Sequence, residues 1–142
     1  MSFTVSSTGK FKRPFRHGPE ELEMIAFFDY CRAMAHLAPE FALAFHVPNE
    51  SKSSIPRRKT LKRAGLKKGV PDICVPVPRG KYAALYIEMK VKPNKPSPEQ
   101  IQLIAELNAV GNYAVVCWSA DEAIQTLLNY MAGKCPALET SR

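Results

Sequence analysis

Two short apolar runs that each carry one carboxylate constrain this chain more than any other feature. The first run spans residues 72–78 and opens with Asp72, and the second spans residues 83–89 and contains Glu88. Both runs are rich in β-branched and aromatic residues, which favours strands. The dipeptide Arg79-Gly80 between them favours a turn. We therefore predict a hairpin of two strands with one acidic side chain on each strand.

The second run ends in a Glu-x-Lys pattern whose charged side chains share one face of the strand. Alternate residues of a strand point to the same side, so Glu88 and Lys90 project together and Met89 projects to the other side. If Asp72 opens the neighbouring strand, its carboxylate meets this pair at one end of the hairpin. Two carboxylates beside an ammonium group can hold a divalent cation, and this arrangement predicts a nuclease.

Six positions carry a resemblance to a known family, and they are Gly69, Pro71, Asp72, Glu88, Lys90 and Gln100. The Pro-Asp and Glu-x-Lys pairs resemble the signature of the PD-(D/E)XK nucleases. The whole ordered set resembles the VRR-NUC branch, which is found in small phage-type proteins and at the C-terminus of the Fanconi-associated nuclease. The resemblance extends from residues 46–50 through residues 61–66 to about Tyr130.

The resemblance implies an α/β fold of the restriction-endonuclease type, in which helices flank a small mixed β-sheet. It also implies a deoxyribonuclease that hydrolyses phosphodiester bonds with Mg2+ or Mn2+. Such hard cations prefer oxygen ligands, and the expected ligands are Asp72, Glu88 and the backbone carbonyl of Met89. Lys90 would position the attacking water or balance negative charge. Gln100, in the opening turn of the next helix, would face the site.

A glutamate on the first helix is a further candidate, because members of the family carry a functional glutamate there. We predict this helix from Pro19 to about Leu37. Glu20, Glu21 and Glu23 compete for the role, and Glu20 is favoured because it shares a face with the apolar residues of the helix. The alternative is that Glu20 only stabilises the first turn through the helix dipole.

The segment 51–70 concentrates positive charge without a single acidic residue. Its cations are Lys52, Arg57, Arg58, Lys59, Lys62, Arg63, Lys67 and Lys68. Because this run directly precedes the expected metal site, we predict that it contacts DNA phosphates, with a solvated surface as the alternative. A short basic helix is expected within residues 59–65, and Asn49 is a candidate substrate contact.

The remaining elements complete a mixed α/β order of strand, strand, strand, helix, strand, helix. Further strands are predicted at residues 41–47 and 113–118. Further helices are predicted after the capping residues Ser97 and Ser119. His46, at the end of one of these strands, is interpreted as structural because nothing near it forms a nucleophile–base pair.

Prolines distinguish the two strands of the hairpin. Proline cannot donate a hydrogen bond to a ladder, so Pro76 and Pro78 require the outer end of the first strand to fray or to lie at an edge. The second strand, residues 83–89, contains no proline and should lie inside the sheet.

Length and charge are those of a single small domain. The chain has 142 residues and a formal net charge of +7. We divide it into a basic N-terminal arm at 1–17, a nuclease domain at 18–133 and a tail at 134–142. No apolar run approaches the ~20 residues of a membrane span, and no signal peptide is recognisable. The four cysteines lack a Cys-x-x-Cys pair and are expected to be reduced core thiols, which favours the cytoplasm of a bacterial or phage-infected cell.

The preferred interpretation is a metal-dependent DNA endonuclease that acts as a homodimer on branched DNA such as a Holliday junction. The dimer and the junction rest on the resemblance to small stand-alone family members. The main alternative is a catalytically inactive DNA-binding module that uses the basic segment 52–68. A second alternative is an acidic protein or an RNA bound through the same charges. No membrane partner is expected.

Overall fold

The computed structural model describes residues 16–48 and 54–138 of the chain. Its elements along the chain are α1 (Pro19–Met34), the 3-10 helix η1 (Pro39–Leu43), β1 (Phe45–His46), α2 (Ile55–Arg63), β2 (Ile73–Val75), β3 (Leu85–Met89), α3 (Pro98–Ala109), β4 (Tyr113–Cys117) and α4 (Ala120–Met131). None of the helices in these ranges is both long and apolar enough to cross a membrane.

The four strands form one mixed sheet in the order β1-β2-β3-β4. β2 is antiparallel to both β1 and β3, whereas β3 and β4 are parallel. In the register, Ile73 lies opposite Ile87, which lies opposite Val115 on the other side. β3 is therefore internal, as predicted, and it carries Glu88 into the middle of the sheet.

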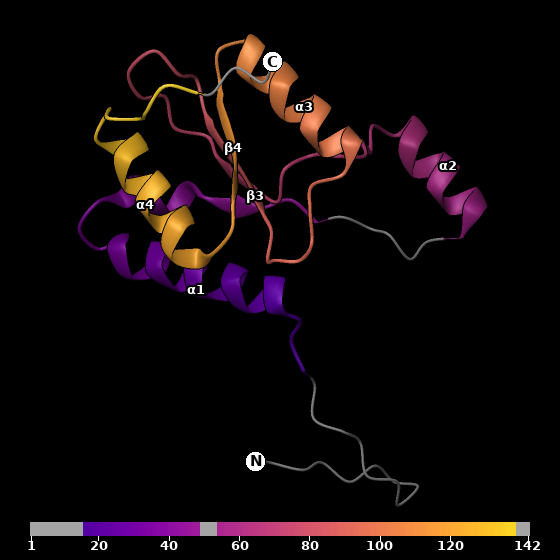
Figure 1. Cartoon of the computed structure of the whole chain (residues 1–142), viewed down its shortest axis with the longest axis horizontal. Coiled ribbons are helices and arrows are strands. Elements are labelled where there is room, and N and C mark those ends of the chain that lie inside the picture. Colours follow the sequence, from indigo (N-terminus) through magenta and orange to yellow (C-terminus); the bar gives the residue numbers. More distant parts are fainter. Residues whose placement is uncertain (1–15, 49–53, 139–142) are drawn as a thin grey trace, which may run out of the picture.

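Helices cover both faces of the sheet (Figure 1), as an architecture of packed layers requires. α1 and α4 pack on one face, where alternate residues of β3 (Leu85, Ile87 and Met89) are fully buried in the core. The intervening residue Glu88 points to the opposite face, toward α3. The predicted small mixed sheet flanked by helices is confirmed.

α2 projects from the body of the molecule (Figure 1) and has no buried residue. It begins at Ile55, earlier than the predicted helix within 59–65. The Ser54 hydroxyl accepts a hydrogen bond from the Arg57 N–H at 3.4 Å, and Pro56 in the first turn has no N–H to satisfy. These capping signals extend the helix toward its N-terminus.

The predicted strand at 41–47 is wrong over its first half. Residues Pro39–Leu43 form η1, and only Phe45 and His46 pair with β2. The 3-10 turn places Phe41 in the core, where its ring lies 6.5 Å from that of Tyr30. Tertiary burial of one aromatic ring therefore overrides the strand propensity of this segment.

The first strand of the predicted hairpin, residues 72–78, is shorter in the structure, and so is the first helix. β2 ends at Val75, directly before Pro76, so the proline-containing outer end leaves the strand, which is one of the two predicted alternatives; the strand itself lies between β1 and β3 and not at an edge. α1 ends at Met34 instead of about Leu37.

Turns and caps follow the predictions closely. The turn between β2 and β3 pairs Arg79 with Tyr82, and Gly80 has a positive φ of 55°. Ser97 and Ser119 cap α3 and α4. All four cysteines are free thiols, and three of them are buried in the core.

Candidate active site

Asp72 lies at the junction between a glycine–proline loop and β2. Gly69 in this loop has a φ of 89° and lies so close to α3 that an added Cβ would sit 2.7 Å from the backbone carbonyl carbon of Glu99. Only glycine fits both this conformation and this close contact. The loop therefore docks on the start of α3 and directs Asp72 toward β3, where its Oδ2 accepts a hydrogen bond from the Met89 N–H at 3.0 Å.

Glu88 is a buried carboxylate that is only 1% exposed. Its Oε1 accepts a hydrogen bond from Gln100 Nε2 at 2.7 Å and lies 3.3 Å from Lys90 Nζ. Its Oε2 is buried and has no hydrogen-bonding partner among the described residues. Burying a polar oxygen without a partner costs about 1–3 kcal/mol or more. The sheet therefore presents one unsatisfied carboxylate oxygen to whatever binds beside Asp72.

Burial raises the affinity of both carboxylates for positive charge. Burial raises the pKa of Glu88 to about 7, and the negative charge of Asp72 adds to this shift while Lys90 opposes it. Burial also raises the pKa of Asp72, against the effects of the Met89 N–H, His46 and Lys90. A site that resists two adjacent negative charges binds either a proton or a cation.

Gln100 connects the site to the N-terminus of α3 through both ends of its amide. Its Oε1 accepts a hydrogen bond from the Ser97 N–H at 2.8 Å, which completes a capping box with the Ser97 hydroxyl. The amide nitrogen is then directed to Glu88. The predicted placement of Gln100 facing the site agrees with this geometry.

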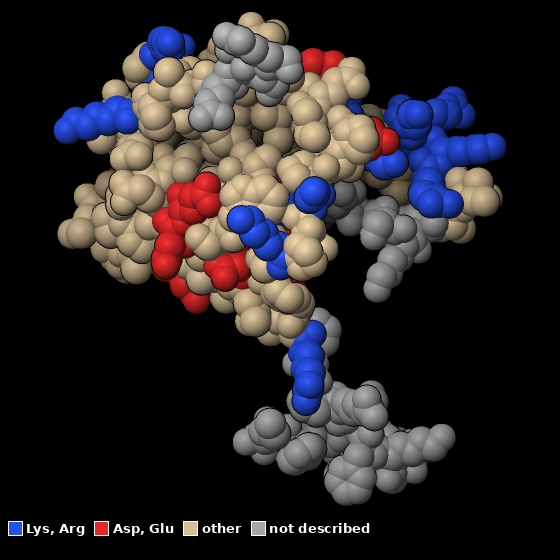
Figure 2. Space-filling view, viewed as in Figure 1, with Lys and Arg blue, Asp and Glu red and all other residues tan. Residues whose placement is uncertain are grey.

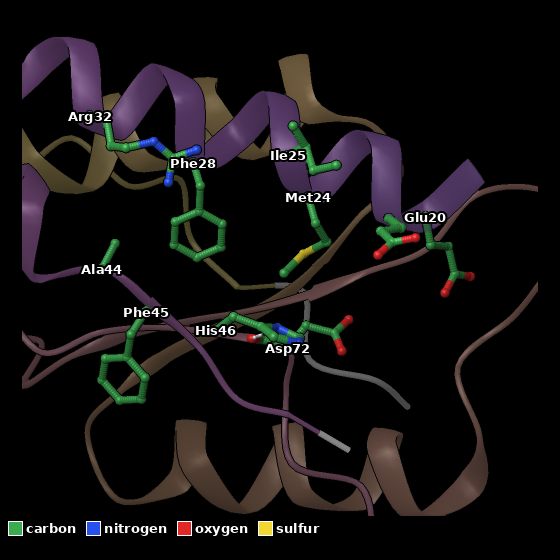
Figure 3. Close-up of a pocket in the computed structure, with 10 residues that line it drawn as sticks. Glu20, Met24, Ile25, Phe28, Arg32, Ala44, Phe45, His46 and Asp72 are labelled. Atoms are coloured by element: carbon green, nitrogen blue, oxygen red, sulfur yellow. Dashed lines mark hydrogen bonds between the residues drawn. The ribbon is translucent and has the colours of Figure 1, made fainter. Parts of the chain in front are cut away.

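The first-helix glutamates have three different environments. Glu20 lies beside a groove that also contains Asp72 (Figure 3), and its Oε1 accepts a hydrogen bond from Asn94 Nδ2 at 3.2 Å. Glu21 lines the same groove and pairs with His17 at 3.0 Å. Glu23 instead accepts a hydrogen bond from the Ala120 N–H at the start of α4. Glu23 is thereby engaged in capping, and Glu20 and Glu21 are the two glutamates that line the groove with Asp72.

Two neighbours of the site were not predicted to belong to it. The Nδ1 of His46 lies 2.9 Å from the backbone oxygen of Asp72, because β1 pairs with β2 at this point. Asn94 comes from the loop after β3 and contacts Glu20. His46 was recognisable as a polar residue at a strand end, but its register with β2 was not. Asn94 carries no sequence signal beyond its position in a proline-rich loop.

The basic segment forms an exposed surface at one side of the molecule. Figure 2 shows Lys and Arg side chains gathered over α2, which carries Arg57, Arg58, Lys59, Lys62 and Arg63. Lys67 follows in an exposed loop, and Lys68 forms an ion pair with Glu99 at 3.2 Å. Asn49 and Lys52 lie outside the described residues. This surface and the carboxylates are joined through the Gly69 loop.

The donor set suits a hard divalent cation. The described ranges contain no group of three or more His, Cys, Asp or Glu side chains that could hold a metal ion. Mg2+, however, is commonly bound through only one or two carboxylates and keeps several waters. Asp72 and the unsatisfied Oε2 of Glu88 supply two carboxylates and meet that requirement. The residues present therefore fit Mg2+ or Mn2+.

Comparison with known proteins agrees with this arrangement. The family model of the VRR-NUC domain matches residues 30–121, which include Asp72, Glu88, Lys90 and Gln100. A solved structure of a VRR-NUC domain protein is similar with a TM-score of 0.70 and 25% sequence identity, over 83% of this chain and 92% of that one. The curated proteins contain no match. The chain therefore belongs to the VRR-NUC family of nuclease domains.

Proposed function

We propose that the chain is a metal-dependent DNA endonuclease whose single active site is formed by Asp72, Glu88 and Lys90. The observation that carries this proposal is the buried Glu88 Oε2, which has no partner within the described residues and lies in a site with a second carboxylate. A core oxygen left unsatisfied is costly, and a bound cation would remove the cost. Membership of a nuclease family supports the same chemistry.

Asp72, Glu88 and the Met89 carbonyl would hold the cation. When bound, Mg2+ or Mn2+ supplies positive charge that stabilises the reacting phosphate and makes an attacking water more acidic. Lys90 lies 3.3 Å from Glu88 and is 13% exposed, so its ammonium group can reach both the carboxylate and a substrate oxygen. Gln100 keeps Glu88 in place through its hydrogen bond to Oε1. Glu20 would contribute a further carboxylate at the groove side of Asp72.

The exposed cations of α2 and the following loop would hold the sugar–phosphate backbone. Their contacts would be independent of sequence, because phosphates are the same at every position. Because this surface is separate from the carboxylates, we assign DNA binding to α2 and DNA cleavage to the carboxylate site on the sheet. Asn49 and Lys52 would extend the binding surface.

We assign branched DNA as the preferred substrate and a homodimer as the acting form. One metal site cuts one strand in each binding event, and a junction needs two matched cuts. A closed two-fold dimer supplies two sites by symmetry. The net charge of +7 also suits the dense phosphates of a branch point.

A plasmid-nicking assay with Mg2+, Mn2+ or excess EDTA tests the proposed activity. Conversion of supercoiled to nicked plasmid is expected with either metal and should stop when EDTA is added. Metal-independent nicking would contradict the proposed chemistry. DNA binding without nicking under any of these conditions would instead identify the chain as an inactive DNA-binding module.

A further inference from the structure

The loop between β3 and α3 carries positive charge that the chemistry proposed above does not use. Residues 90–98 contain three lysines and no acidic residue. Lys90 belongs to the proposed active site, whereas Lys92 and Lys95 are exposed on the loop beyond it. Figure 2 shows Lys and Arg side chains where this loop passes in Figure 1, apart from those over α2. A second basic surface therefore begins at the site itself.

Hydrogen bonds hold this loop in one position relative to the site. The Asn94 N–H donates to the Val91 carbonyl at 3.0 Å, and the Asn94 side chain donates to Glu20 on α1. At the end of the loop, Ser97 forms the capping box of α3. The two exposed lysines therefore project from an ordered backbone, and a ligand that binds them does not have to order the loop first.

The side chain of Lys92 lies over the single tryptophan of the chain. Its Nζ is 5.9 Å from the centre of the Trp118 ring, within the range of a cation–π contact. Trp118 follows Cys117, whose carbonyl accepts a hydrogen bond from the Lys90 N–H at 2.9 Å. Trp118 is only partly buried. It therefore offers a platform beside the site that holds the ammonium group without neutralising its charge.

Neither exposed lysine of this loop forms an ion pair within residues 16–48 and 54–138. The acids nearby are engaged with uncharged donors, since Glu20 accepts a hydrogen bond from Asn94 and Glu122 accepts one from the Trp118 N–H at 2.9 Å. By contrast, Lys68 of the basic segment is paired with Glu99. Cations without a carboxylate partner on an ordered loop suit an external anion, and a DNA phosphate is the anion that the proposed reaction brings to this place.

We propose that Lys92 and Lys95 bind phosphates of the DNA strand next to the phosphate held at the carboxylates, and that Trp118 positions Lys92 for this contact. The inference rests on the proposed nuclease function and defines the path of its substrate. The loop leaves the site directly after Lys90, so a DNA backbone that reaches Lys90 continues along it. Figure 1 shows α2 and this loop on different sides of the first turn of α3. The two basic surfaces would thus hold the DNA at two separate places.

The salt dependence of DNA binding tests this inference. A fluorescently labelled linear duplex of mixed sequence is titrated with the protein in EDTA, where no cut is expected. Lys92→Gln should lower the slope of log affinity against log salt by about 0.9, the value for one lost phosphate contact on duplex DNA. The double variant Lys92→Gln, Lys95→Gln should lower it by about 1.8. Lys92→Arg keeps the charge and should retain the slope of the wild type.

Lys81→Gln is the control matched to Lys92→Gln. Lys81 Nζ lies 5.4 Å from the centre of the Tyr82 ring, in the turn at the other end of the hairpin. The substitution therefore also removes one charge from a cation–π pair, but its slope should equal that of the wild type. Equal falls in the two variants would reduce the effect to net charge and overturn the proposal, as would an unchanged slope in Lys92→Gln.

Trp118 supplies a second measurement, because it is the only tryptophan in the chain. Addition of the duplex should change its fluorescence in the wild type and in Lys81→Gln, but not in Lys92→Gln. Trp118→Ala should weaken binding by about 2- to 5-fold, and Trp118→Phe should bind like the wild type. Equal affinities of Trp118→Ala and the wild type would overturn the role of Trp118. Because binding is read without cleavage, a protein that fails to nick plasmid but loses slope in Lys92→Gln would keep this contact and lose the nuclease assignment.

Discussion

At the scale of single residues, Glu88 connects the fold to the proposed chemistry. It lies on an internal strand where an apolar side chain would pack better, and one of its oxygens has no partner in the described part of the chain. The apolar face of β3 stabilises the sheet, while Glu88 on the other face keeps a pKa raised to about 7. A buried group with such a shift is characteristic of functional sites. Burial of the Glu88 carboxylate without a full set of partners would destabilise the metal-free protein, and the same burial would favour binding of a cation.

Glu88→Gln should therefore make the metal-free protein more stable at alkaline pH. The pKa of Glu88 rises from 4.5 to about 7 on folding, so the stability it contributes is full below about pH 4.5 and is lost as the pH rises through about 7. At pH 8 in EDTA we expect the free energy of unfolding of Glu88→Gln to exceed that of the wild type by about 1–3 kcal/mol, since one pKa unit corresponds to about 1.4 kcal/mol. At pH 5 the difference should shrink.

Urea denaturation at both pH values measures this effect. Glu106→Gln is the control, because Glu106 is exposed on α3 and accepts a hydrogen bond from Gln102 on the same helix. It should follow the wild type at either pH. A Glu88→Gln protein that is less stable than the wild type at pH 8 would show that the ionised carboxylate is already well compensated.

At the scale of elements, the loop before β2 and the first turn of α3 form one unit. Gly69→Ala places a Cβ against the Glu99 backbone, whereas Gly111→Ala meets nothing within 4 Å although Gly111 has a similar φ of 97°. Both variants carry the conformational cost of a side chain at positive φ, roughly 1–2 kcal/mol. Gly69→Ala should in addition displace Asp72 and lower cleavage about 10-fold or more, because small misplacements of catalytic groups are costly.

The comparison of these two glycine variants isolates the docking of the loop. Thermal unfolding gives the stability of each variant, and single-turnover cleavage gives its activity. Gly111→Ala should lose stability but retain its rate of cleavage. Equal rates in the two variants would show that the contact between Gly69 and α3 does not position the site.

The second prediction at this scale concerns α2. Replacing Arg57, Arg58 and Lys62 by glutamine should weaken binding to every DNA sequence alike. The slope of log affinity against log salt should fall by about 0.9 for each lost phosphate contact on duplex DNA. Lys81→Gln serves as a control, since Lys81 lies in the turn at the opposite end of the hairpin from Asp72. An unchanged slope in the triple variant would leave α2 as solvated surface.

Much of the site could be predicted from sequence because it depends on local patterns. The two-residue period of strands places Glu88 and Lys90 on one side, and the Ser97 cap places Gln100 at the start of α3. The rest depends on tertiary contacts. The burial of Phe41 converts part of an expected strand into η1, and the capping of α4 by Glu23 distinguishes it from Glu20. Neither contact has a signature in the local sequence.

At the scale of the whole molecule, the proposed preference for branched DNA depends on the charge of the domain and on the symmetry of the proposed dimer. Figure 2 shows Lys and Arg side chains gathered over α2 and Asp and Glu side chains gathered near α1 and α4, with further Lys and Arg beside the acidic group. We expect light scattering to show a dimer at working concentrations, and cleavage of a four-way junction to be faster than cleavage of a linear duplex at equal salt. A strict monomer that cuts both substrates equally would refute the dimer and the junction while leaving the nuclease proposal in place.

The central claim is that Asp72, Glu88 and Lys90 act as one metal-dependent site, and single-turnover cleavage with Mg2+ tests it most directly. Asp72→Ala, Glu88→Ala and Lys90→Ala should each lower the rate by about 100-fold or more. The double variant of Asp72 and Lys90 should fall little further, because residues that act as a unit are not additive. Circular dichroism establishes that each variant is folded, and Glu106→Gln should cleave like the wild type. Near-wild-type cleavage by any two of the three folded single variants would contradict the account.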